Sequence, residues 1–339
     1  MTTRSNFPAL LRASLFVLAT ILGTSPTFAQ TCVSGSSTYT FTSFDVPNAT
    51  STRAHGINAP GQIVGRFIDS VRHHHGFLRS ADGTTLTTID PNITGFSNIT
   101  KIAARSINAR GEIVGSFVDS SGISHGFFRS RGGTYSTIDV PDSFGPNTVA
   151  RGINDVGQVV GNYTVLQTVN GVPNLPVQHG FVRSADGTTF TKIDYPGALA
   201  TIAGGINDSG EIVGGYADTP GSGTFFEPHG FTLRDGVFTT FDSACGTTGS
   251  FAHSINEPFA VVGSDSTIAN LFNLQAEDGA PDGLSGFVMS ADGTTFTSID
   301  FPAAGELGTQ ARGMNAAGTV VGDYADSSDV DHAFLATPF

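Results

Sequence analysis

The sequence predicts an all-β fold, a six-bladed β-propeller of four-stranded antiparallel blades, because three observations agree. A pattern of about 50 residues recurs six times, which is the usual length of one propeller blade. The composition of the 339-residue chain, with 43 Gly, 27 Phe and only 13% charged residues, favours short strands and tight turns over long amphipathic helices. The two ends of the chain carry complementary parts of one repeat, so pairing them closes a ring.

Each repeat converts into four strands. The phrase Gly-Ile-Asn-x-x-Gly-x-Ile-Val-Gly covers the end of the first strand and the start of the second. Its Asn-x-x-Gly part forms the turn between the two strands. The third strand carries His-Gly-Phe, and an Asp-Gly or Gly-Gly hairpin joins it to a Thr-rich fourth strand that ends in Asp. In the first repeat we expect the second, third and fourth strands at 62–68, 75–80 and 84–89. The repeated turn asparagine is Asn58, Asn108, Asn154, Asn207, Asn256 and Asn315.

The chain ends predict how the ring closes. Residues 38–45 form a lone fourth strand, and the C-terminal repeat has its first three strands but no fourth. We therefore expect residues 38–45 to pair with residues 332–336. An open row of repeats gains nothing from such a split, whereas a closed ring exposes no terminal unit.

The His-Ala-Phe phrase at His332 and the related His-Gly-Phe phrases resemble those of the HAF family of probable extracellular repeat proteins. The resemblance covers roughly residues 38–336, and the fifth repeat departs from it, with Ser285 in place of His. It implies export and a repeat scaffold, and it implies no defined reaction.

The N-terminus predicts export. Arg4 and Arg12 precede a short apolar run at 13–23, and a small-x-small cleavage site ends at Ala29. We expect a signal peptide at 1–29, an N-terminal segment at 30–37 and the propeller at 38–339. A buried N-terminal helix is the alternative for the leader. The expected location is secreted, either extracellular or periplasmic, and we expect no membrane span.

The charge restricts the class of partner. The formal net charge is −13, and removal of the leader leaves 14 basic against 29 acidic residues, a net charge of −15. An acidic surface repels phosphate backbones, so we expect no nucleic-acid partner. The protein is expected to be a monomer. Cys32 and Cys245 either form a disulfide or remain separate thiols, and the sequence leaves both possibilities open.

The connections between strands predict where a ligand binds. The turns between strands one and two and between three and four are short. The connections between strands two and three vary in length, as at 164–178 and 266–284, and so do those between strand four and the next strand one. Both kinds lie on the opposite face of the disc. Variable loops on a rigid scaffold usually carry binding residues. We therefore expect the binding site on this loop-bearing face, around the central channel.

One position of the first strand is basic in five of six repeats, and ring symmetry gathers it at the channel mouth. These candidate ligand-binding residues are His55, Arg105, Arg151, His253 and Arg312, with Gly204 at the sixth place. A cationic ring suits a carboxylate, sulfate or phosphate group. The alternative interpretation is that these residues pair with the Asp that ends each fourth strand, such as Asp90 or Asp139.

We expect no metal and no cofactor. The repeated histidines are interpreted as structural, bonding a neighbouring strand or the Asp that follows strand two, as at Asp69, Asp119, Asp218 and Asp326. Residues 73–75 are three consecutive histidines, but neighbours on a strand point to opposite faces, so all three do not share an ion. The acidic stretch 277–282 is a weak calcium candidate, because it lacks the twelve-residue loop pattern of an EF-hand.

No catalytic motif is visible, so the catalytic residues stay unknown. The favoured function is a secreted scaffold that binds a glycan, a peptide or a cell-surface partner, with an anionic small molecule as another ligand class. The first alternative is a propeller lyase, hydrolase or lactonase that acts on an acidic or polar substrate at the channel. The second alternative is a calcium-held matrix or adhesion protein.

Overall fold

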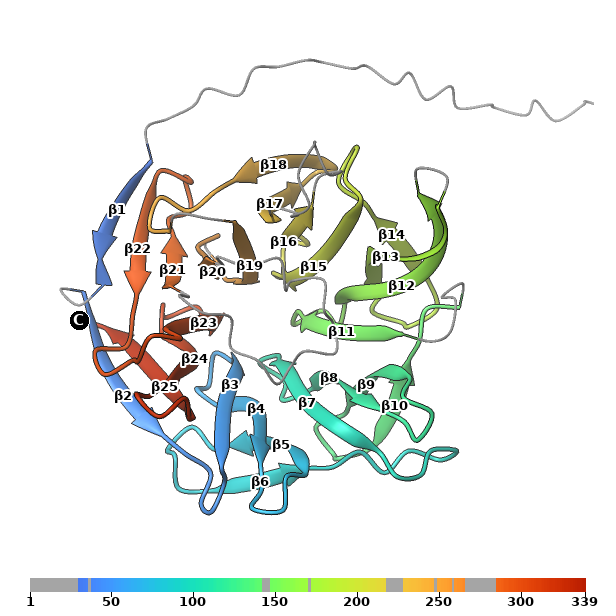
Figure 1. Cartoon of the computed structure of the whole chain (residues 1–339), viewed down its shortest axis with the longest axis horizontal. Helices are drawn as coiled ribbons and strands as arrows, with labels where there is room; N and C mark the ends of the chain where they lie inside the picture. The colour runs from blue at the N-terminus through green and yellow to red at the C-terminus, as the bar shows by residue number, and fades with distance from the viewer. Residues whose placement is uncertain are drawn as a thin grey trace, which may run out of the picture.

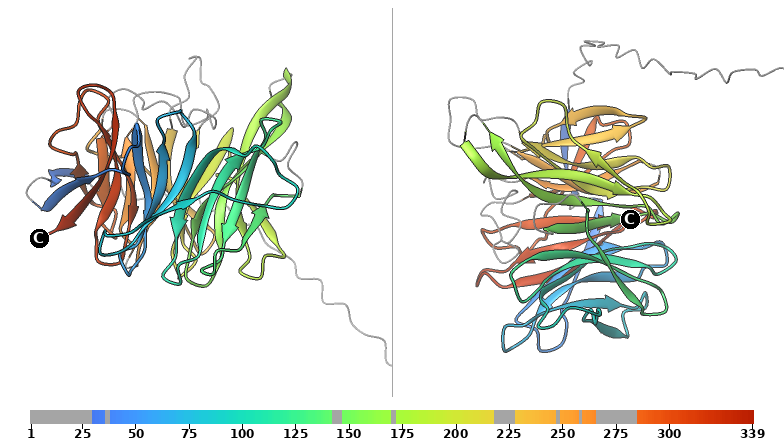
Figure 2. Two further views of the ribbon diagram at one scale, coloured as in Figure 1. Left: turned by 90° about the horizontal axis from the view of Figure 1, so that it is seen from below. Right: turned by 90° about the vertical axis from the view of Figure 1, so that its right-hand side faces the viewer.

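The computed structural model contains six antiparallel sheets arranged as blades around a central axis (Figure 1). The structure describes residues 30–35, 38–141, 147–169, 172–217, 228–246, 249–257, 259–265 and 285–339. Each blade is a meander whose first strand lies nearest the axis, and the edge-on views show the blades standing side by side (Figure 2). The predicted six-bladed β-propeller is confirmed.

The strands follow the repeat in order. Blade one contains β3 (Ser51–Ile57), β4 (Ile63–Ile68), β5 (His74–Arg79) and β6 (Leu86–Ile89). Blade two contains β7 (Thr100–Ile107), β8 (Ile113–Val118), β9 (Ser124–Arg129) and β10 (Tyr135–Ile138). Blade three contains β11 (Thr148–Ile153), β12 (Val159–Val169), β13 (Val172–Arg183) and β14 (Phe190–Ile193). Blade four contains β15 (Ala200–Ile206), β16 (Ile212–Ala217), β17 (Pro228–Arg234) and β18 (Val237–Phe241).

The last two blades incorporate the N-terminal strands. Blade five contains β19 (Ser250–Ile255), β20 (Val261–Asp265), β21 (Ser285–Met289) and β22 (Thr295–Ile299), with β1 (Thr31–Ser34) added outside β22. Blade six contains β23 (Thr309–Met314), β24 (Val320–Ala325) and β25 (Asp331–Pro338), completed by β2 (Tyr39–Phe44).

The core lies between adjacent blades rather than inside any one of them. One cluster, for example, joins Val64 and Ile89 of blade one to Ile113 and Phe127 of blade two. A four-stranded sheet with two apolar faces hides both faces by standing between neighbours. The Phe of each His-Gly-Phe phrase is almost fully buried in these clusters. The six are Phe77, Phe127, Phe181, Phe231, Phe287 and Phe334.

The closing strand pairs as predicted. β2 runs antiparallel to β25, with Phe41 opposite Ala336 and Phe44 opposite Ala333. The ring of Phe41 lies 6.1 Å from that of Phe334, centroid to centroid. The N-terminal strand β2 and the C-terminal strand β25 therefore lie in one blade, and the ring has no exposed end unit.

The N-terminal segment forms a second connection across the ring. β1 pairs in parallel with β22, and Cys32 and Cys245 form a disulfide between residues 213 positions apart. The question that the sequence left open is thus settled in favour of the disulfide. β1, which lies in a segment for which no strand was predicted, provides the fifth strand of blade five.

One predicted loop is wrong. The stretch 164–178 does not form an irregular connection, because it continues β12 and β13 as an extended hairpin in which Thr164 pairs with Gln178 and Gln167 with Leu175. The Val and Thr residues of this stretch favour strand over loop.

Several expectations fall on residues that the structure does not describe. They are the signal peptide at 1–29, the connection 266–284 with its calcium candidate at 277–282, and Asp218. Within the described residues, no helix has both the length and the apolar character needed to cross a membrane.

Candidate functional site

The candidate ring is positioned by a backbone irregularity that recurs in every blade. The register between the first and second strands shifts at one residue, for example between Ala54 and Gly56 in β3 and between Ala150 and Gly152 in β11. A β-bulge of this kind inserts an extra residue and re-aims its side chain. The inserted residues are His55, Arg105, Arg151, Gly204, His253 and Arg312.

These six residues, together with Phe251, line one small cavity of about 30 Å³ on the axis. A second cavity of about 90 Å³ is lined by the same six positions and the two residues that follow each. A third, of about 140 Å³, lies at the turn asparagines. The ring is therefore recessed in the channel, since the His55 residue is only 8% exposed and the Arg312 side chain only 15%. The first cavity has room for a few water-sized groups at most.

Most ring residues bond to the second strand of their own blade. The Nε atom of Arg105 donates to the Ser116 hydroxyl at 3.2 Å, and that of Arg151 donates to Asn162 Oδ1 at 2.6 Å. The equivalent residue in blade six is a carboxylate, so Arg312 forms an ion pair with the buried Asp323.

The two ring histidines find different partners. His253 Nε2 lies 3.0 Å from the Ser264 hydroxyl of its own blade. His55 Nδ1 instead lies 3.1 Å from the carbonyl oxygen of Ala104 in the next blade. Blade one has Arg66 at the second-strand position, which places a further cation near the ring. The ring residues and the second-strand residues that accompany them are together called the belt.

In blade four both positions are glycine, Gly204 at the ring position of the first strand and Gly215 at the accompanying position of the second. The Phe251 side chain of blade five fills this place, because a Cβ added at Gly215 would lie 2.5 Å from its ring. The channel is therefore asymmetric, with an aromatic wall at blade four and cations around the remainder.

Burial and mutual repulsion act on these groups together. Burial lowers the pKa of Arg105 well below its usual value, and the nearby Arg151 and Arg312 lower it further. Burial and Arg312 lower the pKa of Arg151 to about 10. Burial and the surrounding arginines also lower the pKa of His55 and His253 well below 6.5, so both imidazoles are neutral at pH 7. The arginines therefore supply the positive charge.

The alternative pairing predicted for the ring is wrong, because the Asp that ends the fourth strand bonds the repeated histidine or, in blade five, the Ser285 that replaces it. His75 Nδ1 lies 2.9 Å from Asp90, and His125 Nδ1 lies 3.1 Å from Asp139. The other nitrogen of the imidazole faces the Asp after strand two, as expected, at 3.4 Å from Asp69 in blade one. This histidine links the third strand to both of its neighbours within a blade.

The sequence analysis missed the belt members on the second strand. They occupy the position after the Gly of Ile-Val-Gly, and their identities differ between blades: Arg66, Ser116, Asn162, Gly215, Ser264 and Asp323. The signal that finds them is register, since each of these positions directly follows the Gly that pairs beside the bulge on the neighbouring strand. No repeated residue type marks them.

Comparison with known proteins gives similarity of fold only. No family model and no curated protein matches the chain. The β-propeller domain of the Trilobed protease from Pyrococcus furiosus is 8% identical, with a TM-score of 0.45 over 85% of this chain and 97% of that one. The α-L-arabinanase of Penicillium chrysogenum, solved with arabinobiose, is 11% identical, with a TM-score of 0.46 over 89% and 98%. The resemblance to HAF repeats stays a prediction.

Proposed function

We propose that the protein is an exported binding scaffold whose central channel takes up a small anion or the anionic end of a larger ligand, such as an acidic glycan. The observation that carries this proposal is the convergence of Arg105, Arg151 and Arg312 from three separate blades on one recessed cavity. A carboxylate, sulfate or phosphate group is complementary to such a site, because guanidinium groups bind these anions through paired hydrogen bonds.

The electrostatics of the belt support an anionic ligand. Asp323 is the one carboxylate that bonds a ring residue among the described contacts, and it bonds Arg312. Arg312 lowers the pKa of both Arg105 and Arg151, and Arg151 lowers that of Arg105, which means that these charges repel across the cavity. An anion placed among them replaces repulsion by attraction, and the effect is large where water is scarce.

The arrangement favours binding over catalysis. Enzymes need unlike groups that converge within hydrogen-bond reach of one reacting atom. Here Arg105, Arg151 and His253 occupy equivalent positions and bond the second strand of their own blade. The cavity also has room for a small group rather than for a sugar ring.

Export rests on the leader and on the covalent structure. The predicted signal peptide directs the chain out of the cytosol, and the disulfide between Cys32 and Cys245 is typical of an oxidising compartment. An extracellular or periplasmic scaffold is the function class that joins these features.

The test is calorimetric titration of the mature protein with sulfate, phosphate, citrate and glucuronate at low ionic strength. We expect at least one of these anions to bind, and we expect Arg105→Gln and Arg151→Gln each to weaken it 10-fold or more. Arg131→Gln, at an exposed turn, removes the same charge away from the channel and should bind as the wild type does.

Equal anion affinity in Arg105→Gln, Arg151→Gln and Arg131→Gln would overturn the proposal, as would the failure of all four anions to bind. The thermal midpoint measured without anion guards against misfolding. Because each channel variant removes a repelling charge, we expect its midpoint to stay at or above that of Arg131→Gln.

A further inference from the structure

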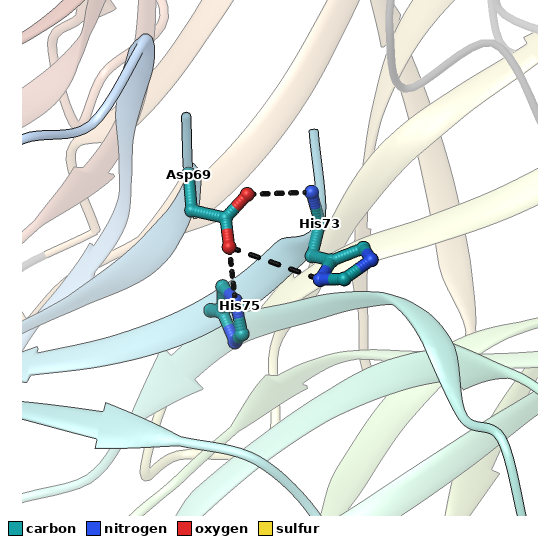
Figure 3. A group of neighbouring side chains, drawn as sticks. All are labelled: Asp69, His73 and His75. Atoms are coloured by element: carbon teal, nitrogen blue, oxygen red, sulfur yellow. Dashed lines mark hydrogen bonds and ion pairs between the residues drawn. The ribbon is translucent and has the colours of Figure 1, made fainter. Parts of the chain in front are cut away.

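Blade one carries a cluster of three potential metal ligands, two of them on the turn between β4 and β5 and the third in β5 itself. The ligand atoms of Asp69, His73 and His75 all lie within 4.8 Å of one another (Figure 3). Asp69 Oδ2 is 3.8 Å from His73 Nδ1 and 3.4 Å from His75 Nε2. Two ligands at tetrahedral angles around Zn²⁺ stand about 3.4 Å apart, so small rotations of exposed side chains complete the geometry.

The turn positions the carboxylate. Asp69 Oδ1 accepts hydrogen bonds from the backbone N–H of Val71 at 2.9 Å and of His73 at 2.8 Å. These bonds hold the side chain in one orientation and direct Oδ2 toward the two imidazoles, as Figure 3 shows. One oxygen therefore maintains the turn while the other faces the proposed ion.

His75 is oriented by a second carboxylate. Its Nδ1 lies 2.9 Å and 3.0 Å from the two oxygens of Asp90, and its ring stacks on Phe67 at 5.0 Å. In the neutral tautomer that carries its hydrogen on Nδ1, His75 donates to Asp90 and presents the lone pair of Nε2 toward Asp69, where it can ligate a cation. A carboxylate behind a ligating imidazole is the usual support of a metal-bound histidine.

The three consecutive histidines divide as strand geometry requires. His74 points to the opposite face of the sheet, where its Nδ1 lies 3.4 Å from Arg66 Nη1. His73 and His75, two residues apart, share a face with Asp69. The sequence-based interpretation weighed the three histidines with one another and did not consider Asp69 as a third ligand beside His73 and His75.

Other blades provide an internal comparison. Blade six has the same turn, in which Asp326 Oδ1 accepts the N–H of Ser328 and of Val330, and His332 Nε2 lies 3.5 Å from Asp326 Oδ2. His332 is bonded by Asp45 as His75 is by Asp90. Val330 occupies the place of His73, and Ile123 does so in blade two. The Asp–His pair is thus common to blades one, two and six, whereas the third ligand is particular to blade one among them.

We propose that Asp69, His73 and His75 form a site for a first-row transition metal ion such as Zn²⁺, open to solvent at its remaining positions. Two imidazoles and one carboxylate are ligands that Zn²⁺ accepts, and hard ions such as Ca²⁺ prefer oxygen alone. The His73 side chain is 74% exposed, so an ion enters from solvent without rearrangement of the blade. This site is independent of the anion site in the channel.

The experiment is a calorimetric titration of the mature protein with Zn²⁺ alone. The visible spectrum of bound Co²⁺ is recorded separately as a measure of imidazole ligation. We expect one equivalent of Zn²⁺ to bind the wild type. His73→Val introduces the residue of blade six and should weaken binding at least 10-fold with the thermal midpoint of the metal-free protein unchanged. Val330→His should add a second equivalent, because it completes the same cluster in blade six.

Two results would overturn the proposal. One is wild-type affinity in His73→Val, which would place the ion elsewhere, and the other is the absence of Zn²⁺ binding to the wild type at micromolar concentration. The double variant, His73→Val with Val330→His, separates ligation from damage to the fold. We expect it to bind one equivalent, and loss of all binding there would contradict the assigned geometry.

Discussion

At the scale of single residues, the repeated phrases are explained by one contact between two strands. A Cβ added at the last Gly of Ile-Val-Gly meets the preceding strand and the ring of the His-Gly-Phe phenylalanine. At Gly115 it would lie 2.1 Å from the carbonyl oxygen of Ala103 and 2.7 Å from the ring of Phe127. The glycine therefore makes room for the aromatic ring, and the two phrases recur together because neither fits without the other.

We expect Gly115→Ala to lower the free energy of unfolding by about 1–3 kcal/mol, since the methyl group overpacks a buried contact. The measurement is urea denaturation of the mature protein. Gly132→Ala in the same blade is the matched control, because a Cβ there meets nothing closer than the Ser130 hydroxyl at 3.8 Å. Equal loss in the two variants would refute the explanation.

A buried carboxyl makes stability depend on pH. Burial raises the pKa of Asp265 to about 6, although the Ser250 hydroxyl donates to it at 2.9 Å. A raised pKa means that the folded state holds the proton more tightly than the unfolded chain does. The group therefore destabilises the protein increasingly as the pH rises from about 4 to about 6, and the penalty is complete above that window.

Asp265→Asn removes this penalty and keeps an acceptor for Ser250. We expect the variant to be more stable than the wild type at pH 8 by up to roughly 3 kcal/mol, with little difference remaining near pH 4. Denaturation at the two pH values measures the change. Asp329→Asn, at an exposed turn, is the control. A difference that does not vary with pH would show that burial of the charge is not its cause.

At the scale of elements, the repeated turn asparagine ties four of the blades to the next blade among the described contacts. Asn154 Oδ1 accepts the N–H of Gln158 within its own turn, and its Nδ2 donates to the carbonyl oxygen of Asn207 in the following blade at 2.9 Å. Asn58 reaches Asn108 in the same way, and Asn256 reaches Asn315. A turn signal in the sequence is thus also a bond between elements about 50 residues apart.

Asn154→Asp tests this second role, because the substitution keeps the acceptor for Gln158 and removes the donor to Asn207. We expect a loss of about 1–3 kcal/mol, the cost of an unsatisfied buried carbonyl facing an added charge. Asn98→Asp introduces the same charge in an exposed loop and should change stability little. The urea midpoints of Asn154→Asp and Asn98→Asp are compared at pH 7. Equal midpoints would mean that Asn154 acts only as a turn residue.

The elements that the sequence predicts are those with a repeating signal. Four strands a blade, the Asn turns and the closing strand follow from periodicity, and the five basic candidates were identified by their equivalent positions. Asp323 and Arg66 were missed because no single residue type marks their position, which holds Ser in two blades and Arg, Asn, Gly or Asp in the others. Only strand register places this position beside the bulge that carries the ring residue. β1 was missed because four residues of strand carry too weak a local pattern, and its partner β22 lies at the other end of the chain.

At the scale of the whole molecule, two contacts hold the ring closed. β2 completes blade six by pairing with β25, and β1 adds to blade five through β22. The disulfide from Cys32 to Cys245 fixes the segment that precedes β2, so the closing strand is tethered near its place even when its hydrogen bonds open. A ring closed by one strand alone depends on the edge pairing of that strand.

We expect reduction of this disulfide to lower the free energy of unfolding by about 2–5 kcal/mol, because a crosslink between residues 213 apart restricts the unfolded chain strongly. The double variant Cys32→Ser with Cys245→Ser should match the reduced wild type and should not respond to reductant. Hydrogen exchange locates the effect, since loss of the tether should release the amides of β2 before those of the inner strands. Unchanged protection of β2 after reduction would mean that its pairing with β25 alone closes the propeller.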